Sequence, residues 1–124
     1  MDNKKILLVE DDELLQKLYS DLLSSEHFFV ETASDGKTAY EKIKQGGWDL
    51  VLLDIVLPDL SGVEIVKKLM TDNTAKPNKK VVFLTNLDTG SEINEIKKLG
   101  FDYITKSNLN PDQFIEKIKS CIIS

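Results

Sequence analysis

Two apolar runs of the sequence end in carboxylic acids. Leu50–Leu53 is followed by Asp54, and Ile6–Val9 is followed by Glu10 and Asp11. A continuous apolar run of this length is typical of a strand that is buried on both faces. A charge beside such a strand is costly unless a partner compensates it. The acids therefore indicate a site that binds a cation or another charged group.

Two further polar residues follow later apolar runs, Thr85 after Val81–Leu84 and Lys106 after the run around Phe101–Ile104. Three neighbouring carboxylates repel one another, and a bound Mg2+ would relieve that repulsion while leaving coordination positions for phosphate oxygens. The lysine could then act as a point charge for the same phosphate, and the threonine hydroxyl could donate a hydrogen bond. The set predicts phosphoryl transfer with Asp54 as the acceptor.

Short apolar runs alternate with segments of helical spacing along the chain. The five runs are Ile6–Val9, Phe28–Val30, Leu50–Leu53, Val81–Leu84 and the region of Phe101–Ile104. The helical faces contain Leu14, Leu15, Leu18, Leu22 and Leu23, then Ala39, Tyr40 and Ile43, then Val66, Leu69 and Met70, then Ile93, Ile96 and Leu99, and finally Phe114, Ile115, Ile118 and Ile122. The last helix is expected to begin at Pro111.

This alternation predicts an α/β fold in three layers, in which helices cover both faces of a parallel sheet. We expect five strands in the order 2-1-3-4-5 and five helices, the flavodoxin-like arrangement, with residues 1–124 forming one domain. Ligands of such sheets bind beyond the carboxyl ends of the strands, where the strand order reverses. That point lies between the first and third strands, which are the two that end in acids.

The composition argues against several classes of protein. The net charge is -5 and the sixteen basic residues are all lysine, so arginine is not available to read bases, and we expect no direct binding of nucleic acid. Cys121 is the only cysteine, which rules out a disulfide within the chain. No apolar run approaches 18 residues, and the N-terminal run is too short for a signal peptide. We therefore expect a cytoplasmic protein that does not insert into membranes.

Each candidate residue also has a purely structural interpretation. Glu10, Asp11 and Asp12 could cap the helix that follows them, and Asp12 is the one expected to do so. Asp54 could be a turn residue, and Lys106 a solvated surface lysine. The functional interpretation depends on the whole set, because five suitable residue types at the ends of the strands rarely occur together by chance.

The sequence resembles the receiver domain of bacterial two-component response regulators along its whole length. The resemblance is carried by "KKILLVEDDELL", "DLVLLDIVLPDLSGVEIV", "VVFLTN" and "DYITK". The family has the strand order given above. It implies that Asp54 accepts the phosphoryl group and binds Mg2+, together with Asp11 as a direct ligand and Glu10 through water. It also implies a further ligand, the backbone carbonyl of Val56.

The resemblance assigns the remaining roles as well. Thr85 and Lys106 match residues that contact the phosphoryl group, and Tyr103 matches an aromatic switch residue that moves with Thr85. The expected donor is a histidine kinase or a histidine phosphotransfer protein, and small donors should allow self-phosphorylation. A downstream protein should bind the face made by the fourth helix, fifth strand and fifth helix. The chain should be a monomer or a weak, phosphorylation-dependent dimer.

Two residues depart from the family pattern. Ser107 stands where proline usually follows the site lysine, and Asn86 stands where a small residue usually follows the threonine. We expect a trans Lys106–Ser107 bond, because a cis bond without proline costs about 2.5–4 kcal/mol. Val56 and Leu87 occupy the positions that tune loss of the phosphoryl group in the family. Neither can orient a water molecule, so slow autodephosphorylation is expected.

The leading interpretation is a signalling switch that is not a metabolic enzyme. Three other functions are possible for a chain of this topology. A flavin-binding protein of the same topology would need a phosphate-binding loop after the first strand, where this chain has acids. A phosphatase with an aspartyl intermediate usually has a second Asp two residues after its nucleophile, and here that residue is Val56. A phosphorylation-independent interaction module would tolerate loss of site residues, yet all of them are present.

Overall fold

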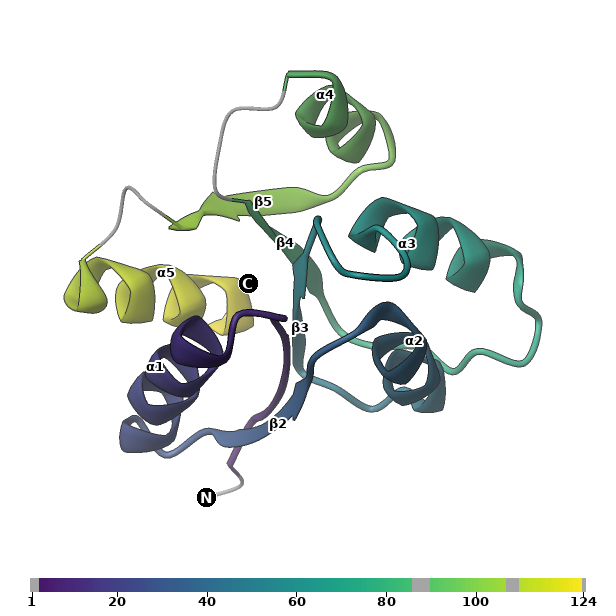
Figure 1. The fold of residues 1–124 in the computed structure, drawn as a ribbon. Coiled ribbons are helices and arrows are strands. Elements are labelled where there is room, and N and C mark those ends of the chain that lie inside the picture. Colours follow the sequence, from purple (N-terminus) through teal and green to yellow (C-terminus); the bar gives the residue numbers. More distant parts are fainter. Residues whose placement is uncertain (1–2, 86–89, 107–109, 124) are drawn as a thin grey trace.

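The central layer is a parallel sheet with the strand order β2-β1-β3-β4-β5, as predicted (Figure 1). It is seen in a computed structural model that describes residues 3–85, 90–106 and 110–123. The strands are β1 (Lys5–Val9), β2 (Phe29–Ala33), β3 (Leu50–Asp54), β4 (Val81–Thr85) and β5 (Asp102–Thr105). Asn86, Leu87 and Ser107 lie outside the described residues, and so does the expectation for the Lys106–Ser107 bond.

Five helices complete the three layers among the described residues. They are α1 (Glu13–Ser25), α2 (Gly36–Gln45), α3 (Gly62–Thr71), α4 (Gly90–Lys98) and α5 (Pro111–Ile123). Helices α1 and α5 cover one face of the sheet, and α2, α3 and α4 cover the other (Figure 1). The last helix begins at Pro111 as expected, since proline lacks only an N–H that a first turn does not use. In the described part of the chain, no helix has the length and hydropathy needed to cross a bilayer.

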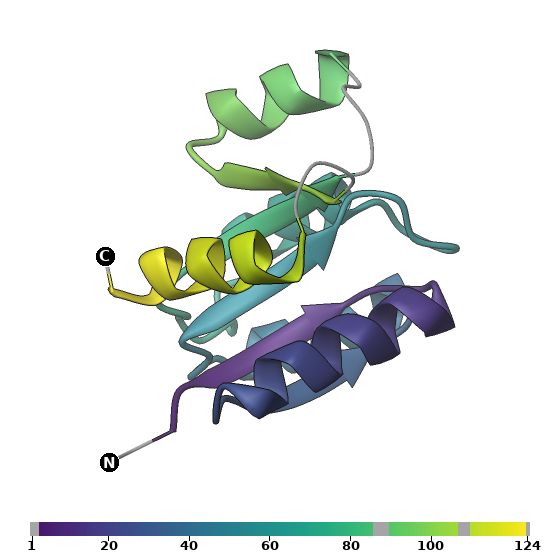
Figure 2. The same cartoon turned by 90° about the vertical axis from the view of Figure 1, so that its left-hand side faces the viewer.

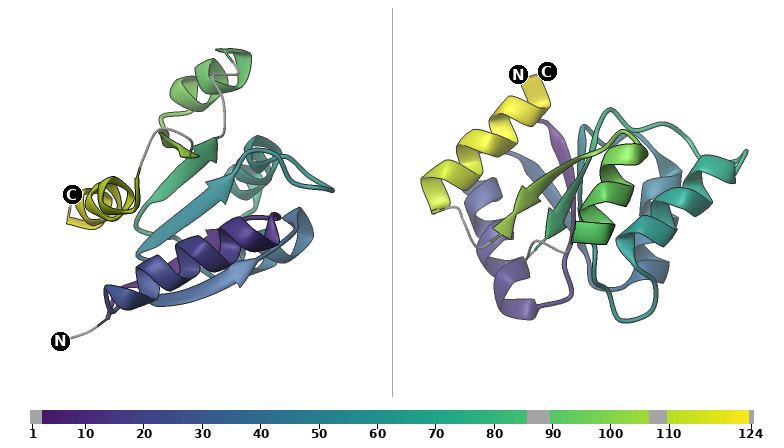
Figure 3. Two further views of the ribbon diagram at one scale, coloured as in Figure 1. Left: turned by 60° about the vertical axis from the view of Figure 1, so that its left-hand side comes forward. Right: turned by 90° about the horizontal axis from the view of Figure 1, so that it is seen from above.

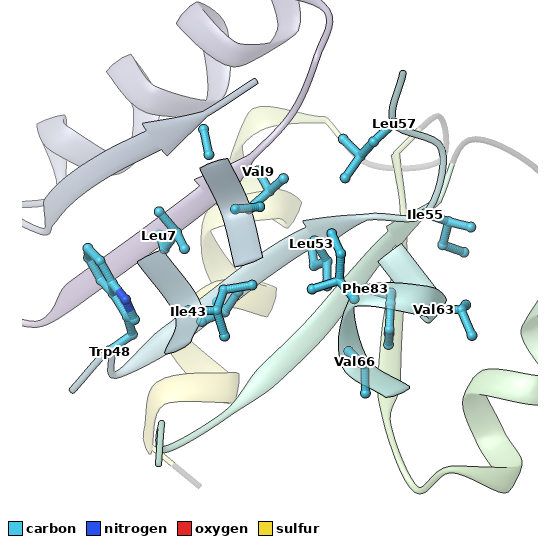
Figure 4. Close-up of a cluster of buried hydrophobic side chains, with 14 of the residues drawn as sticks. Leu7, Val9, Ile43, Trp48, Leu53, Ile55, Leu57, Val63, Val66 and Phe83 are labelled. Carbon is cyan, nitrogen blue, oxygen red and sulfur yellow. The ribbon is translucent and has the colours of Figure 1, made fainter. Parts of the chain in front are cut away.

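Two hydrophobic clusters hold the layers together, one on each face of the sheet. Leu53 and Phe83 project into the first cluster, where they meet Ile43 of α2 and Val66 of α3 (Figure 4). The second cluster joins strand residues to Tyr19, Leu23, Phe114 and Ile118 of α1 and α5. All five residues of β3 are buried, which agrees with the uninterrupted apolar run. This double packing fixes the strand ends on which the polar residues sit.

The apolar residues of α1 are only partly covered. Tyr19 and Leu23 are buried, whereas Leu14 is 82% exposed and Leu18 is 48% exposed. The predicted apolar face is therefore wider than the part of α1 that contacts the sheet and α5. Met70 of α3 is likewise exposed. These three residues belong to the expected helices but contribute little to the core.

Strand β3 extends one residue beyond its apolar run, Leu50–Leu53. Asp54 is its last residue and pairs with Leu84 of β4, and Thr85 is likewise the last residue of β4. Both polar residues are therefore held by the sheet ladder rather than by a loop. Asp12 is the N-cap of α1, as expected, because its carboxylate accepts a hydrogen bond from the N–H of Leu15.

Candidate functional site

The predicted polar residues converge at the carboxyl ends of the strands. Strands β1 and β3 are neighbours, and Val9 is paired with Leu53, so the acids that follow them lie side by side. Glu10, Asp11, Asp54, Thr85 and Lys106 all line one pocket of about 320 Å³. All the strands point their carboxyl ends in the same direction (Figure 2). The parallel sheet thus brings together residues that are separated by up to 96 positions.

Lys106 bridges the two buried acids of this pocket. Its Nζ atom lies 2.5 Å from Oε1 of Glu10 and 2.9 Å from Oδ2 of Asp54. The three side chains are 5%, 1% and 7% exposed, respectively, so water screens these ion pairs weakly. Burying charges is tolerated here because each has a partner of opposite sign. Removing Lys106 would leave two buried carboxylates without a cation between them.

The other carboxylate oxygens accept backbone hydrogen bonds. Oδ1 of Asp54 accepts a bond from the N–H of Val56 at 3.3 Å, and Oε2 of Glu10 accepts one from the N–H of Asp12 at 3.1 Å. Each buried acid is therefore held by a lysine on one oxygen and by the chain that follows its strand on the other. The carboxylates are fixed in position before any ligand binds.

Burial and repulsion change the proton affinity of Glu10. Burial raises its pKa to about 7, and the nearby Asp54 charge acts in the same direction, while the hydrogen bond from Lys106 opposes them. Burial alone would lower the pKa of Lys106, but its hydrogen bonds to Glu10 and Asp54 outweigh that effect and raise it. The lysine therefore stays charged at neutral pH, whereas Glu10 can gain a proton.

Three of the acids are arranged so that they could hold a metal ion. Glu10, Asp11 and Asp54 each offer a carboxylate oxygen, and these oxygens lie within 4.8 Å of one another. Glu10 and Asp54 are buried and Asp11 is exposed, so a cation can approach from the Asp11 side. An all-oxygen set with an open side suits a hard divalent cation that keeps several waters. The donor set therefore fits the predicted magnesium.

The remaining predicted residues are not all in this pocket. The side chains of Thr85 and Val56 line it, Thr85 buried and Val56 69% exposed. Tyr103 is half-buried on β5, where it packs against the cluster under α4 and lines a different cavity. Thr85 and Tyr103 thus lie on adjacent strands and line separate cavities.

Sequence reasoning missed two residues that support the site. The Gln16 side chain of α1 donates hydrogen bonds to the carbonyl of Glu10 at 2.8 Å and to the Ser34 hydroxyl at 3.1 Å. A Cβ atom on Gly62 would lie 2.4 Å from the carbonyl oxygen of Asp54. Gly62 also donates its N–H to the carbonyl of Ile55 at 2.8 Å. Gln16 and Gly62 both contact the backbone of residues in the site. Such a contact cannot be predicted from the sequence, because every residue offers the same backbone groups.

Residues 6–119 match the family model of the response regulator receiver domain. The chain belongs to this family. It is 36% identical to a CpxR homolog from Haemophilus influenzae, a transcriptional regulatory protein, over 95% of this chain and 50% of the relative. It is 30% identical to the polar-differentiation response regulator DivK of Brucella anthropi, over 94% of each chain. The chain spans about half the length of most curated relatives that it matches.

Solved receiver domains have the same fold. A CheY-like receiver domain from Methanospirillum hungatei is 29% identical and has a TM-score of 0.84, with 98% of this chain and 95% of the other covered. The receiver domain of the sensor histidine kinase PA1611 from Pseudomonas aeruginosa is 22% identical, with a TM-score of 0.83 and coverage of 99% and 100%. That structure contains a magnesium ion in its active-site cleft. The comparison with solved structures thus agrees with the receiver fold of this chain.

Proposed function

We propose that this receiver domain is a phosphoacceptor switch of a two-component phosphorelay, with Asp54 as the acceptor. The observation that carries the proposal is the Lys106–Asp54 ion pair within a cluster of three acids that could hold a metal ion. A carboxylate oxygen of Asp54, the Lys106 ammonium and two further acids surround one space, which supports the proposal. Five polar residues from four different strand ends support the same interpretation.

The reaction is a displacement at phosphorus. A carboxylate oxygen of Asp54 forms the new P–O bond, while the bond from phosphorus to a histidine nitrogen or to the oxygen of a small donor breaks and the donor keeps the electron pair. The Lys106 ammonium lies beside the Asp54 carboxylate, so it could contact an oxygen of the phosphoryl group once that group is attached. The Thr85 hydroxyl can donate to another phosphoryl oxygen from the wall of the pocket.

Magnesium would be held by Asp11 and Asp54, by Glu10 through water and by the Val56 carbonyl. When bound, it supplies positive charge that neutralises the phosphoryl oxygens as they approach the acidic pocket. The protein's own contribution is to hold the two buried carboxylates in place. Lys106 pairs with both of them, and backbone N–H groups donate hydrogen bonds to them. The cation therefore meets a preformed set of oxygens.

The proposed donor is a histidine kinase or a histidine phosphotransfer protein, and a small acyl phosphate should also serve. Phosphorylation would draw the Thr85 hydroxyl toward the new oxygens, and the space that it leaves would let Tyr103 turn inward. Because Tyr103 lies on β5 between α4 and α5, this movement would alter the α4–β5–α5 face. A downstream protein would then bind that face with a changed affinity.

Acetyl phosphate and Mg2+ provide the test of this function. The intact mass of the protein should rise by one phosphoryl group, and Asp54→Asn should abolish the rise. Asp21→Asn is the matched control, since Asp21 is an exposed acid paired only with Lys17, and it should be labelled like the wild type. If the Asp54 variant is still labelled, the acceptor is wrong. If the wild type takes up no phosphoryl group, the chain acts as a phosphorylation-independent interaction module.

A further inference from the structure

A second cavity lies on the α4–β5–α5 face, away from the phosphoacceptor pocket. It has a volume of about 310 Å³ and shares no residue with the pocket around Asp54. Strand β5 forms its floor, and α4 and α5 stand on either side of that strand (Figure 3). The cavity reaches Lys80 and Phe101, which lie just before β4 and β5, so it opens toward the amino ends of the strands.

The charge of this cavity is opposite to that of the whole chain. Lys80, Lys97 and Lys117 line it, against a single carboxylate, Asp102. Burial raises the pKa of the Cys121 thiol, which also lines the cavity, so this group adds no negative charge at neutral pH. In a protein of net charge -5, a concave site with excess positive charge is a specific local feature. It complements an acidic ligand.

Two of the three lysines present their ammonium groups to such a ligand. Lys97 and Lys117 are exposed, and neither belongs to an ion pair among the described residues. Lys97 lies over the ring of Tyr103, 5.9 Å from its centroid. Lys80 lies 3.6 Å from the Asp102 carboxylate, which is itself 73% exposed. A ligand carboxylate could therefore contact Lys97 and Lys117 at the surface of the cavity.

The floor of the cavity is the open edge of the sheet. Strand β5 is last in the strand order and pairs only with β4. Among the described residues, no loop or helix donates a backbone hydrogen bond to the outer edge of β5. Asp102, Tyr103 and Ile104 all line the cavity. An extended peptide bound there would meet unpaired main-chain groups, which is how strand addition gives affinity.

We propose that this cavity binds an acidic, extended segment of a partner protein, which pairs with the edge of β5 and places carboxylates against Lys80, Lys97 and Lys117. A protein segment fits better than a nucleic acid, because the open strand edge recognises a peptide main chain and the chain has no arginine. This inference deepens the proposed function, since it names the chemistry of the partner that the α4–β5–α5 face would bind. Its test does not require phosphorylation of Asp54, so the two proposals can fail separately.

The probe is a synthetic decapeptide of alternating glutamate and threonine, titrated into the 15N-labelled protein while backbone amide signals are recorded. Amides of residues 102–105 should shift, together with those of Lys97 and Lys117. The Lys97→Gln/Lys117→Gln variant should bind about tenfold more weakly, as expected for the loss of two partly exposed charge contacts. Lys37→Gln/Lys98→Gln is the matched control, because it removes the same charge, partly from the same helix, but outside the cavity. It should bind like the wild type.

Four outcomes would overturn the proposal. The wild type could fail to bind the peptide, or the control variant could lose as much affinity as the cavity variant. A polyphosphate that binds as tightly, without shifts in residues 102–105, would show that the lysines recognise charge alone. Shifts that depend on protein concentration without any peptide would show that this face binds a second copy of the chain.

Discussion

The Lys106 ammonium lies 2.9 Å from the Asp54 carboxylate, inside the cluster of acids that could hold a metal ion. The same ammonium is 2.5 Å from Glu10. The lysine therefore neutralises two of the carboxylates that a bound metal ion would contact. A metal ion held by these acids would compete with the lysine for the same negative charge, and it could approach from the side of the exposed Asp11.

Replacing Lys106 should separate metal binding from phosphoryl transfer. Lys106→Met removes the competing cation, so we expect Mg2+ to bind several-fold more tightly at pH 8. Phosphoryl uptake from acetyl phosphate should fall by about tenfold or more, because a cation that stabilises the transferring group is lost. Calorimetric Mg2+ titration and intact-mass kinetics measure the two effects. Lys98→Met should change neither, and unchanged Mg2+ affinity in Lys106→Met would show that the two cations do not compete.

The raised pKa of Glu10 predicts a stability that falls with pH when magnesium is absent. The folded chain holds this proton more tightly than the unfolded chain, whose pKa is near the ordinary value of 4.5. The stabilisation is therefore complete below pH 4.5 and is lost as pH rises through about 7. The pKa values of Asp49 and Asp59 are lowered from the ordinary 3.8. Their effect on stability therefore falls at more acidic pH, outside this window.

Melting temperatures in EDTA between pH 5 and pH 7.5 test this prediction. The wild type should lose stability across the range, and Glu10→Gln should lose less, because glutamine does not titrate. Glu13→Gln, an exposed acid in the first turn of α1, should keep the wild-type slope. An equal slope in the wild type and Glu10→Gln would assign the pH dependence to another group.

The close contact between Gly62 and Asp54 predicts that alanine is not tolerated at position 62. The added methyl group would meet the Asp54 carbonyl at 2.4 Å, so the end of β3 or the start of α3 must move. Overpacking of this kind costs about 1–3 kcal/mol, and here the strain falls on the acceptor. We expect Gly62→Ala to lower both stability in urea and the rate of phosphorylation.

Ser61→Ala separates the two effects of the Gly62 substitution. Ser61 caps α3 by accepting a hydrogen bond from the N–H of Glu64 at 3.1 Å. Its loss should cost about 1 kcal/mol of stability. Phosphorylation of the folded protein should stay close to that of the wild type. If both variants lose phosphorylation in proportion to stability, the Gly62 contact has no specific effect on Asp54.

The exposed Val56 side chain predicts a long-lived phosphoryl group. It lines the pocket and cannot hydrogen-bond a water molecule for attack on phosphorus. Val56→Asn should therefore speed loss of the phosphoryl group, measured by intact mass after the donor is removed. Met70→Asn, another exposed apolar residue, should have no effect. An unchanged lifetime in Val56→Asn would mean that water ordering at this position does not limit hydrolysis.

The sequence was most informative about buried strands and about the charged residues at their ends. Uninterrupted apolar runs predicted the buried strands β1, β3 and β4, and the acids after β1 and at the end of β3 form a cluster that could hold a metal ion. The pattern was less informative about burial on α1, because Leu14 and Leu18 have the helical spacing of Leu23 but lie beyond the area that the sheet and α5 cover. Gln16 and Gly62 could not be predicted, since their partners are backbone carbonyls brought close only by the folded chain.

The Lys106–Glu10 contact joins positions 96 residues apart, the residue after the first strand and the residue after the last one. On a ribosome, Glu10 and Asp54 are therefore made long before the cation that neutralises them. An incomplete chain keeps its acids unpaired and cannot assemble the pocket. If Asp54 is the phosphoacceptor, a phosphorylation assay would consequently count only those chains that extend to Lys106 and have folded.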